Sequence, residues 1–394
     1  MVTKTKPTVI YLKDYKKPSY LIEKVELFFD IFKNKTVVKS KMWVKKNYDG
    51  EFQPIVLDGE NQILKHVFYD NQELDSSSYQ LTESHLTIPV KSDEFELSIV
   101  SEIDPASNHA LEGLYVSDGM YCTQNEPEGF RRITYYLDRP DVLAKFTTTI
   151  QADKKLYPVL LSNGNPVSEK ECDDGRHQVT WEDPFPKPAY LFALVAGRLS
   201  CVEDEFITIS NRTIPLRLYV EDGNERRCQH ALGSLKKSMK WDEDVYGLEY
   251  DLDIFMIVAV DAFNMGAMEN KGLNIFNAAC VLADPRTATD NDYIYIERVV
   301  AHEYFHNWTG NRVTCRDWFQ ITLKEGLTVF RDQEFMCDMH SRAVKRISDV
   351  RHLREFQFIE DAGPMAHPIQ PSSYAEINNF YTSTVYEKGA EVIR

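Results

Sequence analysis

The chain has 394 residues and a formal net charge of −16 at pH 7. Chains of this length usually fold as more than one domain, and a hydrophobic content of 43% is sufficient for buried cores and atypical of a disordered protein. Nucleic-acid binding relies on Lys and Arg neutralising phosphates, so the charge argues against a nucleic-acid partner and suits either cationic ligands or an acidic surface that aids solubility.

The N-terminal segment and the cysteines indicate the compartment. Met1–Tyr20 scatters lysines around only four consecutive apolar residues, Val9–Leu12, which is not the pattern of a signal peptide. The longest apolar runs, such as Ile254–Val260, are much shorter than the ~20 residues of a membrane-spanning helix. The seven cysteines include no C-x-x-C pair and fit neither a disulfide framework nor a zinc finger. We therefore predict a cytoplasmic protein that does not enter a membrane.

The first half of the chain is predicted to be mostly β. From about Tyr20 to Val220 apolar and polar residues alternate with the period of half-buried strands, most clearly in Phe95–Ile99. Five Asx-Gly pairs punctuate this half, and glycine's tolerance of positive φ predicts a chain reversal at each. They are Asp49-Gly50, Asp58-Gly59, Asn163-Gly164, Asp174-Gly175 and Asp222-Gly223.

The second half has a different pattern. Arg226–Trp241 has the apolar spacing of a helix, Ile254–Val260 is predicted to be a buried strand, and the rest is typical of helices joined by loops. We therefore predict an α+β fold with an N-terminal β domain over residues 1–198 and a second domain over residues 199–394.

His302-Glu303-Tyr304-Phe305-His306 is the sharpest feature of the sequence. Acidic residues at Asp290 and Asp292 and an apolar stripe precede it, and Gly310 follows it, which together predict a helix. Residues at i and i+4 share a helical face, so both imidazoles can bind one zinc ion while Glu303 points at the metal's open position. There a bound water has a pKa of about 7, and Glu303 can accept its proton. The alternative is a chance match on an ordinary amphipathic helix.

A third zinc ligand is expected from a following helix. Glu325 lies nineteen positions after His306 in a stretch that is predicted to be helical, and its apolar neighbours disfavour a fully solvated carboxylate. Periodicity alone does not place this carboxylate on the metal, so a surface charge is the alternative interpretation.

Gly266-Ala267-Met268-Glu269-Asn270, followed by the His302 motif and Glu325, resembles the aminopeptidase N family of gluzincin zinc metallopeptidases. The surrounding residues, and Thr123–Phe130 upstream, look like bacterial alanyl aminopeptidases in particular, and the resemblance covers nearly the whole chain. It implies an antiparallel, saddle-like β domain followed by a thermolysin-like α/β catalytic domain. It also implies a zinc aminopeptidase that holds one zinc ion per chain and cleaves peptides with a free N-terminus. The implied specificity is broad, with basic and small neutral first residues, and we expect a monomer.

The resemblance assigns roles residue by residue. His302, His306 and Glu325 would be the zinc ligands, with Glu303 as general base and then proton donor to the leaving amine. Tyr386 would donate a hydrogen bond to the oxyanion of the tetrahedral intermediate. The other matched residues would bind the substrate. They are Gln124, Glu126, Met265, Gly266, Ala267, Met268, Glu269, Asn270 and Tyr381.

Glu126 and Glu269, helped by Gln124, would bind the α-ammonium group of the substrate in this pattern. A cation held at a fixed distance from the metal allows only the first peptide bond to react. The backbone of Gly266 and Ala267 would align the peptide like an added strand, and the pocket for the first side chain would be lined by Met265 and Tyr381. On local sequence alone, Glu126 and Glu269 would be ordinary loop carboxylates, and Tyr386 would be one of 21 tyrosines that pack in the core or on the surface.

Two features depart from the family pattern. Cys280 stands where an aromatic residue is expected near the mouth of the site, which predicts a different substrate preference. The family pattern continues beyond the position of Arg394, so we expect an incomplete catalytic domain that binds zinc but hydrolyses peptides poorly by itself.

Three other functions were weighed against an aminopeptidase. A thermolysin-type endopeptidase would share the zinc helix but would not need an amine anchor such as Glu269. A catalytically silent binding module is the second, and zinc content measured together with turnover would separate it from a peptidase. The third is the epoxide hydrolase branch of the same scaffold, which the overall similarity to bacterial peptidases disfavours.

Overall fold

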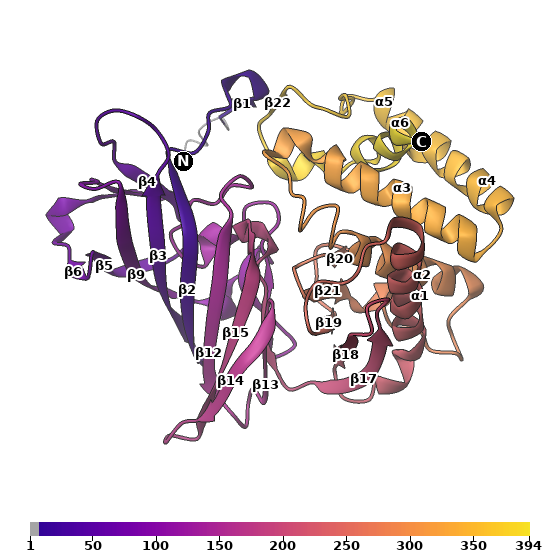
Figure 1. Ribbon diagram of the computed structural model, residues 1–394, viewed down its shortest axis with the longest axis horizontal. Helices are drawn as coiled ribbons and strands as arrows, with labels where there is room; N and C mark the ends of the chain where they lie inside the picture. The colour runs from indigo at the N-terminus through magenta and orange to yellow at the C-terminus, as the bar shows by residue number, and fades with distance from the viewer. Residues whose placement is uncertain (1–7) are drawn as a thin grey trace.

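The computed structural model describes residues 8–394 and shows a sheet-rich first half beside a helix-rich second half (Figure 1). The predicted α+β class is confirmed. Residues 1–7, which begin the segment judged not to be a signal peptide, lie outside the described residues. Among residues 8–394, no helix combines the length and the apolar character that crossing a membrane requires.

An eight-stranded sheet forms the main layer of the first half, in the order β14-β15-β12-β2-β3-β9-β5-β6. Its strands are β2 (Tyr20–Phe32), β3 (Lys35–Lys46), β5 (Ile63–Tyr69), β6 (Gln72–Glu73), β9 (Glu94–Ile103), β12 (Ala144–Asp153), β14 (Asn165–Glu171) and β15 (Arg176–Lys187). Neighbouring strands are antiparallel except β2 and β12, which run parallel. Alternate residues of β9 are buried, as the alternation in Phe95–Ile99 predicts.

Smaller sheets complete the first half. A four-stranded sheet contains β10 (Gly113–Ser117), β11 (Met120–Gln124), β16 (Leu194–Gly197) and β13 (Val159–Ser162). A three-stranded sheet contains β4 (Ile55–Asp58), β8 (His85–Ile88) and β7 (Gln80–Leu81). A short pair, β1 (Ile10–Tyr11) with β22 (Ser373–Tyr374), connects the beginning of the described chain to its last part.

The second half begins with a five-stranded sheet in the order β17-β18-β19-β21-β20. The strands are β17 (Ser200–Ile207), β18 (Thr213–Val220), β19 (Phe255–Val260), β20 (Ala267–Met268) and β21 (Leu273–Asn277). The predicted buried strand is confirmed, since all residues of β19 are buried. It begins at Phe255, one residue later than predicted. The short strand β20 forms an edge of this sheet.

The second half also contains helices, some of which pack on this sheet. They are α1 (Gln229–Tyr246), α2 (Asp290–Phe305), α3 (Thr322–Met339), α4 (Arg342–His352), α5 (Phe358–Asp361) and α6 (Gly389–Ile393), with π-helical turns η9 (Leu353–Gln357) and η11 (Thr384–Lys388) before α5 and α6. The helix predicted at Arg226–Trp241 starts three residues later and ends at Tyr246, because Gly247, with φ of 68°, supplies its left-handed C-terminal cap. The helix α2 starts at the capping box of Thr289 and Asp292 and ends at Phe305.

Positive φ is confirmed at four of the five predicted Asx-Gly pairs, and at Asp174-Gly175 the chain reverses between the antiparallel strands β14 and β15. Gly50, Gly164, Gly175 and Gly223 have φ values of 108°, 86°, 78° and 95°. The prediction for Gly59 is wrong, because its φ is not positive and its backbone continues from an antiparallel bridge between Asp58 and Tyr136. A Cβ atom at Gly59 would lie 2.2 Å from Cδ1 of Tyr135, so close packing explains this glycine.

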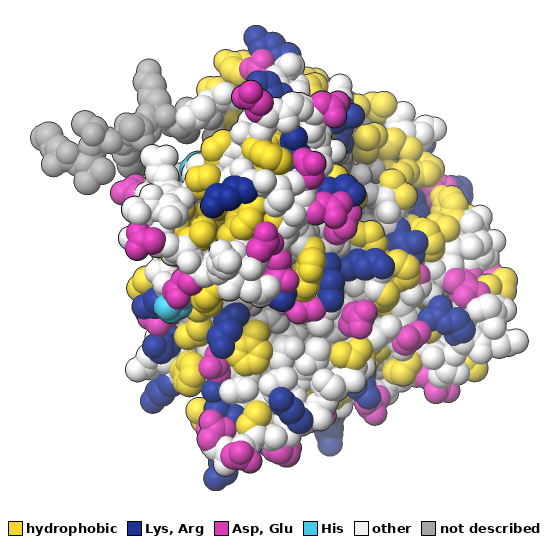
Figure 2. All heavy atoms as spheres, turned by 60° about the vertical axis from the view of Figure 1, so that its left-hand side comes forward, with side chains coloured by type: hydrophobic (Ala, Val, Ile, Leu, Met, Phe, Trp, Pro, Cys, Tyr) yellow, Lys and Arg dark blue, Asp and Glu magenta, His cyan; other side chains and the backbone are white. Residues whose placement is uncertain are grey.

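Charged side chains of both signs are spread over the face of the protein on the side of the large sheet (Figure 2). Figure 2 shows acidic and basic side chains interspersed over this face. The net negative charge therefore produces no single-sign surface there, and the densest group of buried carboxylates lies inside, between the two halves.

Two glycines allow α3 and α6 to approach each other closely. A Cβ atom at Gly326 would lie 2.9 Å from Thr322 Cγ2 and 3.1 Å from Gly389 Cα. This crossing fixes the position of η11, which leads directly into α6 and carries Tyr386.

We predict that Gly326→Ala lowers the midpoint of thermal unfolding, because the added methyl group must displace backbone at the α3–α6 crossing at a cost of roughly 1–3 kcal/mol. Gly233→Ala is the matched control. Gly233 is an exposed helical residue of α1, and among the described residues no heavy atom comes within 4 Å of its added Cβ. This control should gain about 0.5–1 kcal/mol from helix propensity. Equal midpoints for Gly326→Ala and the parent would contradict the close crossing.

Candidate active site

A cavity of about 350 Å³ lies between the two halves, and most of the residues singled out from the sequence line it. These are Glu126, Met265, Gly266, Ala267, Glu269, His302, Glu303, His306, Glu325, Tyr381 and Tyr386. Gln124, Met268 and Asn270 are buried behind this lining. The segment after β11, the segment around β20, and α2, α3 and η11 therefore meet in one place although they lie far apart in the sequence.

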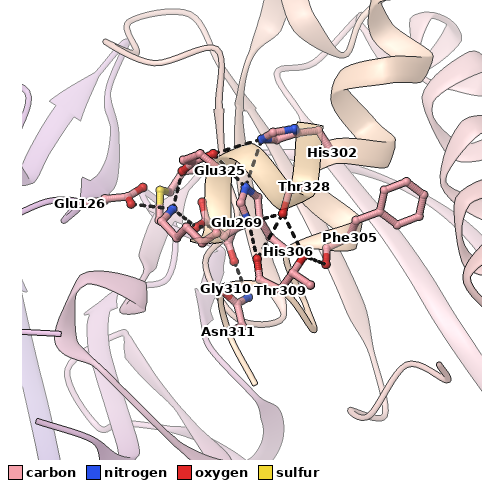
Figure 3. A network of polar contacts seen from close by, with 12 residues as sticks. Glu126, Glu269, His302, Phe305, His306, Thr309, Gly310, Asn311, Glu325 and Thr328 are labelled. Atoms are coloured by element: carbon pink, nitrogen blue, oxygen red, sulfur yellow. Dashed lines mark hydrogen bonds and ion pairs between the residues drawn. The ribbon is translucent and has the colours of Figure 1, made fainter. Parts of the chain in front are cut away.

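His302, His306 and Glu325 line the cavity and form a compact group (Figure 3). His302 lies in the last turn of α2 and His306 directly follows the helix, while Glu325 lies in the first turn of α3. The two Nε2 atoms are 3.0 Å apart, and Oε2 of Glu325 is 3.4 Å from that of His302 and 3.2 Å from that of His306. A tetrahedral zinc ion with bonds of about 2.1 Å holds its ligand atoms about 3.4 Å apart.

The surroundings of this group also fit a zinc ion. Oε2 of Glu325 is buried, and its polar neighbours are the Nε2 atoms of His302 and His306. Nδ1 of His302 lies 2.9 Å from Asp332 Oδ2, and Nδ1 of His306 lies 2.9 Å from the carbonyl oxygen of Thr309. Such contacts orient the other ring nitrogen toward a metal. Two imidazole nitrogens and one carboxylate oxygen therefore converge on one point and are suited to bind a divalent cation.

The pKa of His302 indicates that the surroundings of these three side chains favour a positive charge. Burial lowers the pKa of His302, but the hydrogen bond to Asp332 and the surrounding carboxylates raise it more, to about 10. A cation placed between these ligands would satisfy the same negative charges.

Glu303 and Tyr386 present their polar groups to the cavity. Within residues 8–394 neither side chain makes a hydrogen bond, and both line the cavity beside the His302 ring. The Tyr386 ring is stacked on that of His302, with centroids 6.2 Å apart. Burial raises the pKa of Glu303 well above its usual value, and the carboxylates of Glu269 and Glu325 raise it further, against the lowering effect of His302.

Glu126 and Glu269 meet at a buried ammonium group that the sequence did not indicate. Nζ of Lys324 lies 2.6 Å from Glu126 Oε1, 2.5 Å from Glu269 Oε1 and 2.6 Å from Glu325 Oε1. All four side chains are nearly inaccessible to solvent. One ammonium group thus links the two predicted amine-binding carboxylates to the predicted zinc ligand.

The three carboxylates exceed the one ammonium in charge, and their pKa values show the consequence. Burial lowers the pKa of Lys324, but Glu126, Glu269 and Glu325 raise it more, so the ammonium stays charged. Burial and the neighbouring Glu269 raise the pKa of Glu126 to about 8. Burial also raises the pKa of Glu269, but Lys324 and His306 lower it more. A further cation beside Glu126 would be stabilised.

Backbone contacts hold this anchor in place from both halves. Nε2 of Gln124, at the end of β11, donates to the carbonyl oxygen of Glu126 at 3.0 Å. Nδ2 of Asn311 donates to the carbonyl oxygen of Glu269 at 2.8 Å. Gln124 therefore contacts the backbone of the Glu126 loop and does not line the cavity.

The wall beside the anchor is the sheet edge formed by β20. Gly266 and Ala267 line the cavity at this edge, with Met265 next to them. Cys280 lies behind the wall, since its Sγ is 3.7 Å from Tyr295 Oη and 3.7 Å from the position of a Cβ atom at Gly266. An effect of Cys280 on substrate preference would therefore act through the cavity residues in front of it.

Lys324 and Asp332 are the important site residues that the sequence analysis missed. Lys324 directly precedes Glu325, and a lysine in a helix with apolar neighbours gave no sign of burial. Asp332 follows Glu325 by seven residues, which is two helical turns, so its position on the same face of α3 was a usable signal.

Comparison with known proteins agrees with the geometry. The family model "Peptidase M1 N-terminal domain" matches residues 15–191, and "Peptidase family M1 domain" matches residues 230–394. The chain is 59% identical to Aminopeptidase N of Escherichia coli and 57% identical to Aminopeptidase N of Caulobacter vibrioides, in each case over 98% of this chain. It spans 44% and 45% of those two proteins, which is less than half of their length.

A solved structure has the same fold. The crystal structure of Legionella pneumophila aminopeptidase A in complex with aspartic acid superposes with a TM-score of 0.91 at 38% identity, covering 98% of this chain and 44% of that one. Aminopeptidases of the M1 family are zinc-dependent, and the His302, His306 and Glu325 group is suited to hold such a metal. Taken with the two family models, which together cover most of the sequence, these similarities show that the chain belongs to peptidase family M1.

Proposed function

We propose that this chain supplies the active site of a zinc aminopeptidase that removes the first residue from peptides with a free N-terminus. The observation that carries the proposal is the single cavity in which a metal-binding group adjoins buried carboxylates suited to an amine. Relatives named Aminopeptidase N support it. Broad specificity for basic and small neutral first residues is part of the proposal and comes from the family resemblance.

His302, His306 and Glu325 would hold one zinc ion per chain. When bound, zinc lowers the pKa of water and polarises a peptide carbonyl group. The carboxylate of Glu303 accepts a proton from the attacking water and then gives it to the nitrogen of the leaving amine. The Tyr386 hydroxyl donates a hydrogen bond to the developing oxyanion.

Glu126 and Glu269 would bind the α-ammonium group and set the register of cleavage. Their charge, together with that of Glu325, exceeds the charge of Lys324, so a second ammonium group is favoured beside them. An amine held there leaves only the first peptide bond within reach of the metal group. This anchor favours an exopeptidase over an endopeptidase, which would have to bury these charges without using them.

We also propose a domain boundary near residue 198. Strand β16 ends at Gly197 in the four-stranded sheet and β17 begins at Ser200 in a different sheet, which supports this position. The predictions of a monomer and of a cytoplasmic location stay predictions.

We predict that Glu303→Gln retains zinc but lowers kcat by at least about 10²–10⁴-fold, because the ligands are unchanged and the proton acceptor is lost. His302→Ala should instead lose zinc. Metal content and hydrolysis of alanyl amide are the two measurements. Full activity in Glu303→Gln would contradict the proposed mechanism.

For the amine anchor, we predict that Glu269→Gln raises KM for alanyl amide by about 10–100-fold, the value of one charge-assisted hydrogen bond. Glu94→Gln is the control, since it removes a carboxylate whose side chain is 72% exposed, far from the cavity. The parent should not cleave the N-acetylated form of the same substrate. Equal cleavage of both forms would exclude an exopeptidase.

For the proposed oxyanion donor, we predict that Tyr386→Phe lowers kcat by about 10²–10³-fold with little change in KM, because the hydroxyl acts only when charge develops on the substrate. Tyr11→Phe, at an exposed tyrosine of β1, is the matched control. Steady-state kinetics decide this, and an unchanged kcat in Tyr386→Phe would remove the residue from the mechanism.

A further inference from the structure

Arg298 is a basic side chain of the active-site cavity that the proposed mechanism does not use. It lies on α2, lines the 350 Å³ cavity and also lines an adjoining cavity of about 180 Å³. No hydrogen bond or ion pair joins its guanidinium group to any other residue in the range 8–394. Burial lowers the pKa of Arg298, but the carboxylates of Asp332, Glu387 and Asp349 lie close enough to raise it. The ring of Tyr295 is 5.9 Å away. Its donors are therefore free to bind a ligand.

The acids nearest to Arg298 have partners of their own. Asp332 is 2.9 Å from Nδ1 of His302, Glu387 lies 3.4 Å from Nε2 of His352, and Asp349 pairs with Lys345. These acids stabilise the charge of Arg298 from a distance, and none of them forms a close ion pair with it within the described residues.

The position of Arg298 on α2 places it on the side away from the amine anchor. Arg298, His302 and His306 follow one another in steps of four residues, each about 6 Å along the helix axis. Nδ1 of His306 lies 4.0 Å from Glu269 Oε1, so the His306 end of this row is the anchor end. Figure 3 likewise shows Glu126 and His302 on opposite sides of the network. Arg298 lies one further step beyond His302.

This spacing suits the part of a substrate that follows the cleaved bond. Two extended residues span about 7 Å. A substrate whose amine is at Glu126 and Glu269 would therefore extend past the metal group in the direction of Arg298. A guanidinium group matches a carboxylate through paired N–H donors.

Resting on the proposed aminopeptidase function, we propose that Arg298 binds a carboxylate on the second residue of the substrate. The carboxylate is either the free α-carboxylate of a dipeptide or the side chain of Asp or Glu at the second position. The subsite would make the enzyme prefer such substrates over neutral ones of the same size.

The alternative is a structural role for Arg298. Oδ1 of Asp332 is buried and has no hydrogen-bond partner in the described part of the chain. Arg298 could orient Asp332, and through it His302, without contacting substrate. A structural role would change the binding of charged and neutral ligands equally, whereas a carboxylate subsite changes their ratio.

The test measures equilibrium binding by calorimetry in the Glu303→Gln background, which prevents turnover. One pair of ligands is Ala-Ala and Ala-Ala amide, and the other is Ala-Asp amide and Ala-Asn amide. We expect the charged member of at least one pair to bind about tenfold more tightly, and Arg298→Gln to abolish the difference. Arg286→Gln is the control, because it removes the same charge from a side chain that is 86% exposed.

The outcomes separate the sources of the carboxylate. A preference confined to the first pair assigns the subsite to the α-carboxylate, and a preference confined to the second assigns it to an acidic side chain. Equal binding within both pairs overturns the proposal. A preference that survives in Arg298→Gln also overturns it, because the carboxylate would then bind elsewhere, for example to the metal. An equal loss of affinity for charged and neutral ligands in Arg298→Gln overturns it as well. Cleavage of alanyl amide by the parent tests the aminopeptidase function separately.

Discussion

A buried excess of negative charge is the constraint on which the site depends. Glu126, Glu269 and Glu325 share the single ammonium group of Lys324, and all four side chains are almost fully buried. Buried carboxylates are stable only when cations or hydrogen bonds compensate them. Protonation of Glu126, whose pKa is raised to about 8, relieves part of this excess, and a metal at Glu325 and an amine at Glu126 would compensate it further. Because Glu126 comes from the first half and Lys324 from α3, the packing of the two halves also assembles the site.

A second layer of contacts fixes the end of α2, where the histidines lie. Arg331 forms a buried ion pair with Asp242 of α1 and donates to the carbonyl oxygen of Phe305 at 2.8 Å and to Thr309 Oγ1 at 3.1 Å. The carbonyl oxygen of Thr309 in turn accepts from His306. Three helices thus determine the orientation of one imidazole. Ligand orientation of this kind commonly controls metal affinity as strongly as ligand identity.

The sequence predicted those features that depend on local spacing. The i, i+4 relation of His302 and His306 and the strand alternation could be recognised because helix and strand periods are local properties. The contact between Lys324 and Glu126 joins residues almost two hundred positions apart, and nothing near either residue indicates it. Gly59 shows the same limit, because packing against Tyr135 is invisible in a sequence that displays a turn dipeptide. The family resemblance reached Glu126 and Glu269, which local spacing could not.

Charged side chains differ between the two ends of the cavity, and in the proposed aminopeptidase this difference would favour one direction of peptide binding. The amine end holds the excess carboxylates and the C-terminal end of α2, where the helix dipole is negative. The dipole decays within the last turn, so it adds to the field at His306 and contributes little at Arg298 in the middle of the helix. At the other end Arg298 lines the cavity together with Asp332 and Glu387. In the proposed function a peptide would place its amine at Glu126 and Glu269, and the reverse orientation would bring its carboxylate against them. The carboxylates that would bind the amine would therefore also oppose binding in the reverse direction.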